Sequence, residues 1–305
     1  MKNITICIIT YNQEDVIGRA LDSLLQQKEW GLYRIVVNDD CSNDRTWAIL
    51  KEYQEKYPEI VYPYRNKHNL GIYPNLEQAI THLPDSDLYS FLSGDDEYCN
   101  DYFKEVQNLI IEQKVNTDSA VGIFSDWKTV STDKKIIVHS QNASVSGIRL
   151  WSLKARGKLT NRSLMISKKV LDNFEPILKG HGLNLTESHH DSQPFLNIKE
   201  VYYFSRITTI YYSDIGVSTK LSLSNSDYLT HQNIEKWKYG INHYVHDNCD
   251  MHYAQYQLLK SEFYLNPSLG KLLSAFYHFE LGQLPGYRDS FRSTVRTFWN
   301  LAKLL

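Results

Sequence analysis

Two pairs of neighbouring aspartates are the residues in this chain most suited to chemistry. Asp39 and Asp40 follow one apolar run, and Asp95 and Asp96 follow another. Adjacent carboxylates repel each other unless a cation or hydrogen-bond donors offset their charge. Hard oxygen ligands of this kind suit Mg²⁺ or Mn²⁺, and Mg²⁺ in proteins commonly joins one or two carboxylates to substrate phosphates. The alternative interpretation is that both pairs lie in solvated turns, where Asp is common.

The apolar runs before these aspartates have the pattern of buried strands. The run 4–9 is continuous and rich in β-branched residues, as in a strand that is covered on both faces of a parallel sheet. Similar runs occupy 34–37, 60–64 and 88–92, and residues at helical spacing lie between them. This repeated pattern predicts an α/β fold with a mostly parallel central sheet that is flanked by helices.

Polar residues follow three of the predicted strands, at 10–13, 39–44 and 93–97. Ligands of parallel α/β sheets bind beyond the carboxyl ends of the strands. If the three strands are neighbours, their polar ends meet at one edge of the sheet, and we expect the functional site there.

Composition and motifs exclude several classes of protein. The chain has 305 residues, with 33 Lys or Arg against 35 Asp or Glu, so its formal net charge is −2. Nucleic-acid-binding proteins usually carry a basic surface, so we expect no nucleic-acid partner. The sequence has no GxGxxG, GxxxxGK[ST] or GxSxG motif, which argues against dinucleotide-binding, P-loop and hydrolase folds.

Four segments, in order over about the first 100 residues, resemble the family 2 glycosyltransferases of GT-A fold. ICIITYNQEDVIGRALDSLLQQ is similar to that family's opening strand and helix, and RIVVNDDCSNDRT to its DDxSxDxT nucleotide-binding turn. NLGIYPNLEQAI resembles the segment before the metal motif, and FLSGDDEY resembles the DxD-type motif. The resemblance implies a GT-A-like enzyme that transfers a sugar from a nucleotide-sugar, with UDP as the default nucleotide.

The resemblance also implies which residues bind the donor. Asp40 would accept a hydrogen bond from the nucleobase, Asp95 would face the ribose, and Asp96 would bind Mn²⁺ or Mg²⁺ at the diphosphate. The residues implied for nucleotide binding are Thr10, Tyr11, Asn12, Asp40, Asn69, Gly71 and Asp95. The family often has an acidic residue where Ser93 stands, so this chain lacks the first carboxylate of the motif.

A transfer with inversion needs a carboxylate that deprotonates the attacking hydroxyl of the acceptor. The family's base lies in an acidic motif well after the metal motif, and Asp191 is our candidate there, with Glu187 as the second choice. His190 stands in place of the Glu of the family's Glu-Asp pair. The alternative for Asp191 is that it only caps the helix starting at Gln193.

Two other classes of function remain open. A non-catalytic protein of the same fold would bind a nucleotide-sugar or act as a scaffold, and the serine at position 93 favours this. The family's downstream Tyr-x-x-His element corresponds to 211–218, where the histidine is missing, which favours it too. A nucleotidyltransferase has a related sheet, but its usual Gly-rich loop with Arg is absent after the first strand.

The last third of the chain has a helical pattern. We therefore divide the chain into 1–220, with a nucleotide-binding half 1–100 and an acceptor half 101–220, and a helical extension 221–305. One interpretation of this extension is a helical subdomain that only packs on the sheet. The other concerns residues 286–305, which combine four basic residues with aromatic residues and leucines, as in a helix at a membrane surface. This favours a saccharide or lipid-linked saccharide as the acceptor, in the synthesis of surface polysaccharide or glycoconjugate.

Targeting signals are missing from the sequence. No run approaches the roughly 18 apolar residues of a membrane-spanning helix, and the N-terminus lacks a signal-peptide pattern. The four cysteines have neither a CxxC motif nor metal-site spacing, and we prefer a reducing compartment without disulfides as the interpretation. We expect a cytoplasmic protein with peripheral contact at the inner face of the membrane through 286–305, and homo-oligomer formation is left open.

Overall fold

The computed structural model describes most of the chain. The described residues are 1–141, 148–157, 159–174, 193–213 and 248–282, with 231, 233–234, 237–238, 241–242, 245, 298 and 301–303. The chain forms two compact units, of which the first consists of Met1–His181 and His190–Thr219, and the second of Gly182–His189 and Lys220–Leu305. The sequence-based division into domains at residue 220 stays a prediction.

The first unit begins with repeated strands and helices, as the sequence predicts. The four strands are β1 (Ile4–Thr10), β2 (Leu32–Asp39), β3 (Val61–Arg65) and β4 (Leu88–Ser93). Between them lie α1 (Ile17–Leu25), the 3-10 turn η1 (Lys28–Trp30), α2 (Thr46–Lys56) and α3 (Ile72–Thr81). β1 pairs in parallel with β2 and β4, and β2 pairs in parallel with β3. The strand order is therefore β3-β2-β1-β4.

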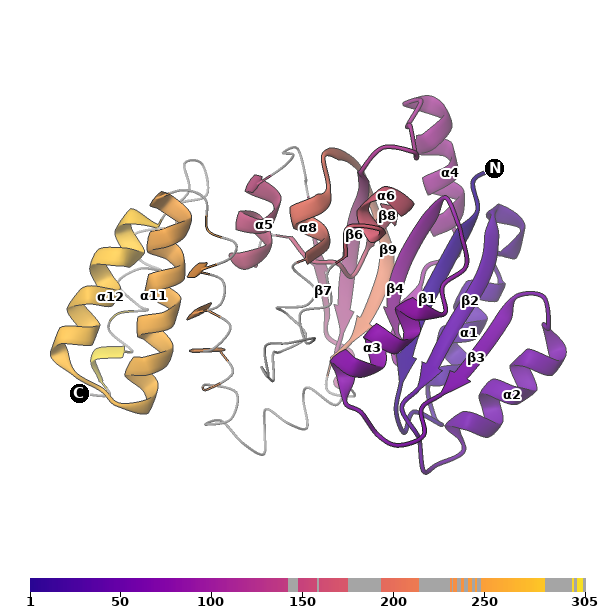
Figure 1. Ribbon diagram of the computed structural model, residues 1–305, viewed down its shortest axis with the longest axis horizontal. Coiled ribbons are helices and arrows are strands. Elements are labelled where there is room, and N and C mark those ends of the chain that lie inside the picture. Colours follow the sequence, from indigo (N-terminus) through magenta and orange to yellow (C-terminus); the bar gives the residue numbers. More distant parts are fainter. Residues whose placement is uncertain are drawn as a thin grey trace. The chain divides into compact units, whose positions relative to one another are not determined.

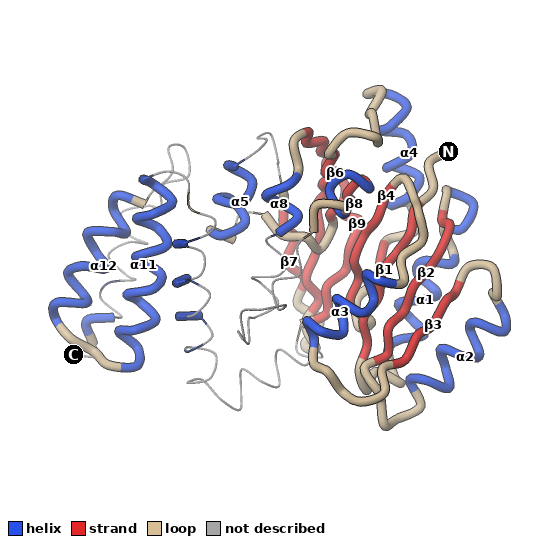
Figure 2. Tube along the Cα trace, viewed as in Figure 1, coloured by secondary structure: helices blue, strands red, loops and turns tan. Residues whose placement is uncertain are grey.

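This order places helices on both faces of the sheet. The right-handed crossovers from β1 to β2 and from β2 to β3 extend the sheet toward one edge. The crossover from β3 to β4 returns past β2 and β1 to the other side of β1. As a result, α3 covers the face opposite to α1 and α2 (Figures 1 and 2). Alternate residues of β1 follow this division, because Ile6 and Ile8 belong to the main core, whereas Thr5 faces the other way and its hydroxyl lies 2.6 Å from that of Ser86.

The second half of the unit continues the same sheet with mixed strand directions. Its elements are β5 (Glu97–Tyr98), α4 (Tyr102–Glu112), β6 (Val121–Val130), β7 (Ile136–His139), α5 (Ile148–Ala155), β8 (Leu164–Ser167), α6 (Lys168–Leu171), α8 (Gln193–Asn197) and β9 (Glu200–Tyr212). β8 runs antiparallel to both β4 and β6, β6 runs parallel to β9, and β9 runs antiparallel to β5. Over the described residues the sheet has nine strands, in the order β3-β2-β1-β4-β8-β6-β9-β5 with β7 paired to β6. The predicted α/β class is confirmed.

The main core lies between the sheet and the helices α1, α2 and α4. Leu21, Leu24, Leu50 and Phe103 are fully buried there against the apolar side chains of the strands. Burying a side chain of this size contributes about 1.5–3 kcal/mol. The sheet is thereby a rigid base for the loops that leave its carboxyl edge.

The second unit contains a helical hairpin of α11 (Asn248–Leu265) and α12 (Leu269–Leu281). Tyr256, Ala275 and Phe279 are buried between the two helices. The hydroxyl of Ser268 accepts a hydrogen bond from the Lys271 backbone N–H at 3.3 Å and caps the start of α12. Among the described residues, no helix has both the length and the apolar character needed to cross a membrane.

Candidate functional site

The three polar strand ends meet at one edge of the sheet, since β1 lies between β2 and β4. Thr10 at the end of β1 pairs with Asp39, and Ile9 pairs with Ser93. Just beyond the strands, the Asp40 backbone N–H donates to the Thr10 carbonyl at 2.9 Å. The residues that follow these strands therefore form a single rim.

The first part of the rim is the turn after β1. The Thr10 hydroxyl donates to Gln13 Oε1 at 2.7 Å. A Cβ atom at Gly94 would overlap Gln13 Oε1 and come within 3.2 Å of Thr10 Cβ. Glycine at position 94 thus lets the loop after β4 lie directly against the turn after β1.

Asn12 joins this turn to the loop after β2. Its backbone N–H donates to Ser42 Oγ at 2.9 Å, and its side-chain Oδ1 accepts from the Asn43 N–H at 2.8 Å. Asn12 has a φ of 50°, a left-handed conformation that asparagine tolerates better than most residues. Tyr11 is half-buried beside it. In this structure Asn12 links two loops, and the predicted contact of Tyr11 and Asn12 with nucleotide stays a prediction.

Asp39 is held entirely by the protein. Its carboxylate is buried and accepts hydrogen bonds from the Ser42 hydroxyl and from the Ser42 N–H at 3.2 Å. Arg65 Nε lies 3.1 Å from Asp39 Oδ2. Burial raises the pKa of Asp39, and the contacts with Ser42 and Arg65 oppose the rise. Asp39 therefore fixes the loop after β2.

Asp40 anchors a second loop. Its Oδ1 accepts from Asn66 Nδ2 and from the Leu70 N–H, both at 2.8 Å, and its Oδ2 accepts from the Gly71 N–H at 2.8 Å. Each carboxylate oxygen accepts about two hydrogen bonds. Over the described residues, one acceptor position thus remains on Oδ2, and the predicted nucleobase contact of Asp40 would have to use it.

The same loop contains the two other predicted nucleotide-binding residues. Asn69 Oδ1 accepts from the Gly71 N–H at 3.1 Å, and Gly71 has a φ of 85°, which favours glycine. Behind the loop, Asn38 Nδ2 donates to the Oδ1 atoms of Asn66 and Asn75 at 3.0 and 2.7 Å. This amide network was not predicted, because it joins β2, the loop and α3.

Asp95 and Asp96 lie at the centre of the rim, and their exposed fractions are only 7% and 4%. Burial raises the pKa of Asp95, while the positive charges of Arg162 and Arg19 and a hydrogen bond with Gln13 oppose the rise. An ionised carboxylate in this position is unfavourable without a ligand that compensates it. This is the electrostatic character expected of a functional carboxylate.

Arg19 of α1 braces one side of the aspartates. Its Nη2 donates to the Asp95 carbonyl at 2.7 Å, and its Nε lies 2.7 Å from Glu97 Oε1. Its guanidinium also stacks 3.8 Å from the ring of Tyr212, whose hydroxyl donates to Glu97 at 2.6 Å. These contacts leave Arg19 in a structural role.

Asp96 is held from β9 and from the loop before β8. Its Oδ1 accepts from the Tyr212 N–H at 3.1 Å, and its Oδ2 lies 3.7 Å from Arg162 Nη1. The Arg162 guanidinium lies 3.4 Å from the ring centre of Tyr211 and 5.2 Å from that of Trp127. No local sequence pattern relates Arg162, Tyr211 or Tyr212 to Asp96, because the three lie in segments far from Asp96 in the sequence.

The donor set at Asp95 and Asp96 fits a divalent cation that shares its ligands with a substrate. Over the described residues, no group of three or more His, Cys, Asp or Glu side chains is close enough to enclose a metal. Mg²⁺ commonly uses only one or two protein carboxylates and completes its shell with phosphate and water. Two neighbouring buried carboxylates beyond the strand ends match that pattern, and Asp96 would be the ligand.

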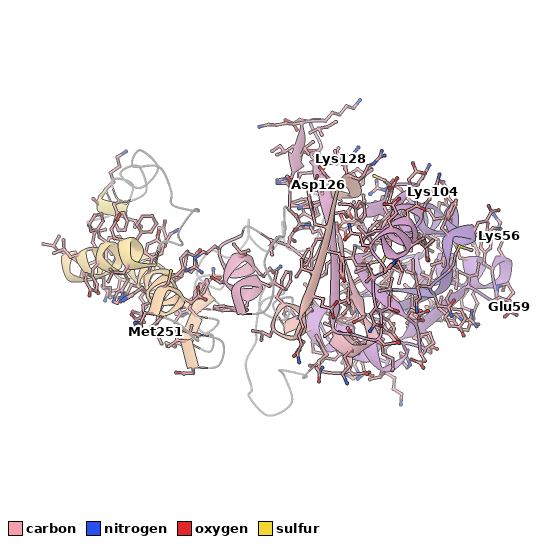
Figure 3. The ribbon with its side chains drawn as sticks, turned by 90° about the horizontal axis from the view of Figure 1, so that it is seen from above. Lys56, Glu59, Lys104, Asp126, Lys128 and Met251 are labelled. Atoms are coloured by element: carbon pink, nitrogen blue, oxygen red, sulfur yellow. The ribbon has the colours of Figure 1, made fainter. Side chains whose placement is uncertain are left out.

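Asp126, a buried carboxylate on β6, holds residues of the neighbouring strand β9. Asp126 Oδ1 accepts from the Tyr203 hydroxyl at 2.8 Å and from the Gln141 N–H at 2.9 Å, and its Oδ2 accepts from the Ser205 hydroxyl at 3.0 Å. Lys128 lies two residues further along the same strand (Figure 3). The pairing of β6 with β9 shifts register on both sides of Asp126. Asp126 thus pins β9, which carries Tyr211 and Tyr212.

The predicted base falls outside the described residues, as does its alternative: neither Asp191 nor Glu187 is described. The same holds for most of 286–305, the predicted membrane-surface segment. Their assignments stay predictions.

The sequence matches the family model described as glycosyl transferase family 2 over residues 5–173. The processive diacylglycerol beta-glycosyltransferase of Mycoplasma pneumoniae is 29% identical over 122 residues, which are 39% of this chain and 35% of that protein. This chain covers only 28% of the length of other curated relatives that it matches.

Two solved structures have a similar fold. The structure of S. aureus TarS 1–349 in complex with UDP-GlcNAc has a TM-score of 0.59 at 14% identity, covering 92% of this chain and 82% of that chain. Mannosyltransferase PcManGT from Pyrobaculum calidifontis, in complex with GDP-Man and Mn²⁺, has a TM-score of 0.55 at 12% identity, covering 99% of this chain and 86% of that chain. At these identities the likeness concerns the fold, and it confirms the predicted GT-A-like architecture.

Proposed function

The chain belongs to glycosyl transferase family 2, and on that premise we propose that it moves a sugar, with inversion, from a nucleotide-sugar to a saccharide or lipid-linked saccharide. The observation that carries the proposal is the convergence of the strand ends. Thr10 ends β1, Asp40 directly follows β2, and Asp95 and Asp96 lie in the loop after β4, yet the four residues share one rim. A nucleotide that lies across this rim would reach all of them.

The chain's own residues have distinct roles in the proposed reaction. Asp40 and the loop 66–71 that it anchors would hold the nucleobase, and Asp95 would face the ribose. Asp191 would accept the proton of the acceptor hydroxyl, whose oxygen attacks the anomeric carbon as the bond from that carbon to the diphosphate oxygen breaks. The products are the glycosylated acceptor and a nucleoside diphosphate.

The cofactor in this proposal is a divalent cation, Mn²⁺ or Mg²⁺, held by Asp96. It would offset the negative charge that develops on the departing diphosphate. The Mn²⁺ complex of PcManGT supports the choice of metal class, because that protein shares the fold.

The test is release of nucleoside diphosphate from UDP-GlcNAc, GDP-Man and related donors, measured by chromatography with Mn²⁺ or with EDTA. We expect metal-dependent release from one donor. Asp191→Ala should lower turnover by about 10²–10⁴-fold and leave donor affinity nearly unchanged, whereas Asp96→Ala should weaken metal-dependent donor binding. Wild-type turnover in Asp191→Ala would refute its assignment as the base.

The same assay separates the competing classes. Donor binding without any release of nucleoside diphosphate would favour a non-catalytic binding or scaffold protein, as Ser93 suggests. Release of pyrophosphate from a nucleoside triphosphate would favour a nucleotidyltransferase.

The acceptor proposal includes peripheral contact with a membrane through 286–305, at the cytoplasmic face. The basic and aromatic composition of that segment supports it. Deletion of 286–305 should lower the fraction of protein recovered with membranes, and unchanged recovery would contradict the contact.

A further inference from the structure

We propose that Arg162 binds the diphosphate of the donor and shares Asp96 with the divalent cation. Before the donor binds, Arg162 would neutralise Asp96. When the cation takes Asp96, the guanidinium would turn to the phosphate oxygens. This inference rests on the proposed function and names the residue that recognises the charged part of its substrate.

The backbone that carries Arg162 is fixed by buried hydrogen bonds. Gln141 Oε1 accepts from the Thr160 N–H at 2.7 Å, and Gln141 Nε2 donates to Ser163 Oγ at 2.6 Å. The Arg162 N–H donates to Thr160 Oγ1 at 3.3 Å. The exposed fraction of Gln141 is 2% and that of Ser163 is 0%. The loop before β8 therefore presents Arg162 from a defined position.

The side chain of Arg162 is guided by aromatic rings. Tyr211 lies against the guanidinium at 3.4 Å and Trp127 at 5.2 Å, and the two rings are nearly perpendicular, with an interplanar angle of 79°. His139 stacks on Trp127 at 3.8 Å and holds that ring in place. Aromatic rings contact the face of an arginine guanidinium without using its N–H groups, so those N–H donors stay available for anions.

Arg162 lies near Asp96 but does not form a direct hydrogen bond with its carboxylate. The 3.7 Å separation from Asp96 Oδ2 is longer than a hydrogen bond. Arg19, by contrast, forms an ion pair with Glu97 and donates a hydrogen bond to the Asp95 carbonyl, each at 2.7 Å. The Arg162 side chain is still 32% exposed, so a ligand at the rim can reach it.

The geometry of the guanidinium matches the proposed ligand. Arginine donates two parallel hydrogen bonds to phosphate and keeps its charge at any working pH. With Asp96 engaged by a cation, Arg162 would lose its neutralising partner, and its guanidinium would be attracted to the negative diphosphate. Loss of Arg162 should thus weaken diphosphate binding and strengthen binding of the metal alone.

Calorimetry on the full chain tests this inference. One variant is Arg162→Met, which keeps a long side chain but removes its charge. The other is Arg162→Lys, which keeps the charge but lacks the paired N–H donors of the guanidinium. The control is Arg206→Met, which removes an exposed arginine that lies 3.8 Å from Glu105, a similar ion pair outside the rim. UDP with Mn²⁺, uridine, and Mn²⁺ alone are titrated, with GDP and guanosine in parallel.

For Arg162→Met we expect the affinity for the nucleoside diphosphate to fall by about 10–100-fold, with the affinity for the nucleoside unchanged. Mn²⁺ alone should bind about 3-fold tighter or more. Arg162→Lys should fall between Arg162→Met and wild type, and Arg206→Met should match wild type in each titration.

Equal diphosphate affinity in wild type and Arg162→Met overturns the inference while leaving the proposed function intact. Unchanged or weaker binding of Mn²⁺ alone overturns the sharing of Asp96. A parallel loss of nucleoside affinity shows a general structural role instead. If wild type binds no nucleotide, the proposed function fails and the inference fails with it.

Discussion

The two neighbouring aspartates at the end of β2, Asp39 and Asp40, differ in what their carboxylates contact. Asp39 points into the protein and is saturated by Ser42 and Arg65. Asp40 is also buried, with an exposed fraction of 2%, and it holds the backbone of Leu70 and Gly71. Both carboxylates therefore hold loops of the rim, and the predicted nucleobase contact of Asp40 stays a prediction.

Asp95 gives a prediction about stability and pH. Burial raises its pKa above the ordinary 3.8, so the native state binds this proton more tightly than the unfolded chain does. The contribution of the Asp95 carboxyl to the free energy of unfolding is greatest below pH 3.8, and it is lost as the pH rises through the pKa of Asp95 in the native state. Asp95→Asn cannot ionise, and it should therefore melt at a higher temperature than wild type at pH 7. In scanning calorimetry, the difference in melting temperature between Asp95→Asn and wild type should shrink as the pH falls, and it should be smallest near about pH 4.

Asp44 is the control with the opposite sign. Burial alone would raise its pKa, but hydrogen bonds with Thr46 and Glu14 outweigh burial and lower it. Asp44→Asn should melt below wild type at pH 7, with the loss disappearing in acid. A lower melting temperature for Asp95→Asn at pH 7 would show that its charge is stabilising instead.

At the scale of elements, β9 controls the site although it follows β4 by more than 100 residues in the sequence. The Tyr212 N–H reaches Asp96 across a separation of 116 residues. The consecutive tyrosines 211 and 212 stack on different arginines, Arg162 and Arg19. The end of β9 therefore braces both sides of the aspartate loop.

Asp126 is the residue that we expect to hold β9 in this position. Asp126→Ala leaves the Tyr203 and Ser205 hydroxyls and the Gln141 N–H without their acceptor. Only the Gln141 residue is buried, and leaving its N–H unpaired costs about 1–3 kcal/mol. The Tyr203 and Ser205 hydroxyls are accessible to water, so urea unfolding should show a loss of about 1–3 kcal/mol. Lys128→Ala, on the same strand, should change stability by no more than about 0.5 kcal/mol. Equal stability of the two variants would contradict the role of Asp126.

At the scale of the molecule, the rim belongs to the first unit, and the second unit contributes the helical hairpin α11–α12. Ligand binding at the rim should be coupled to the stability of the first unit, because a ligand that binds only the native state stabilises it.

A thermal-shift measurement checks this coupling. With Mn²⁺, a nucleoside diphosphate at 100 times its Kd should add about 2.7 kcal/mol, which raises the midpoint by roughly 5–10 °C for a unit of about 200 residues. EDTA should remove most of the shift, since the cation is part of the proposed site. The nucleoside alone is the control, and a shift that survives EDTA in full would argue against the metal.

The sequence by itself determined the α/β class, the four parallel strands and the aspartates at their ends. These features depend on local patterns: apolar runs of strand length, helical spacing, and polar residues where the runs stop. The order of residues along the chain is enough to place Thr10, Asp40 and Asp95 near one edge, once β1 lies between β2 and β4.

Only the tertiary structure decided which groups surround those aspartates. Arg19 lies on a helix face, Arg162 in a loop before β8, and Tyr212 at the end of β9, and no local pattern relates them. Their meeting depends on the strand order in the second half of the sheet and on the register shifts beside Asp126. Such contacts between distant segments follow from how the whole sheet packs, because pairing energies of individual strands depend on their neighbours in space rather than on their own sequence.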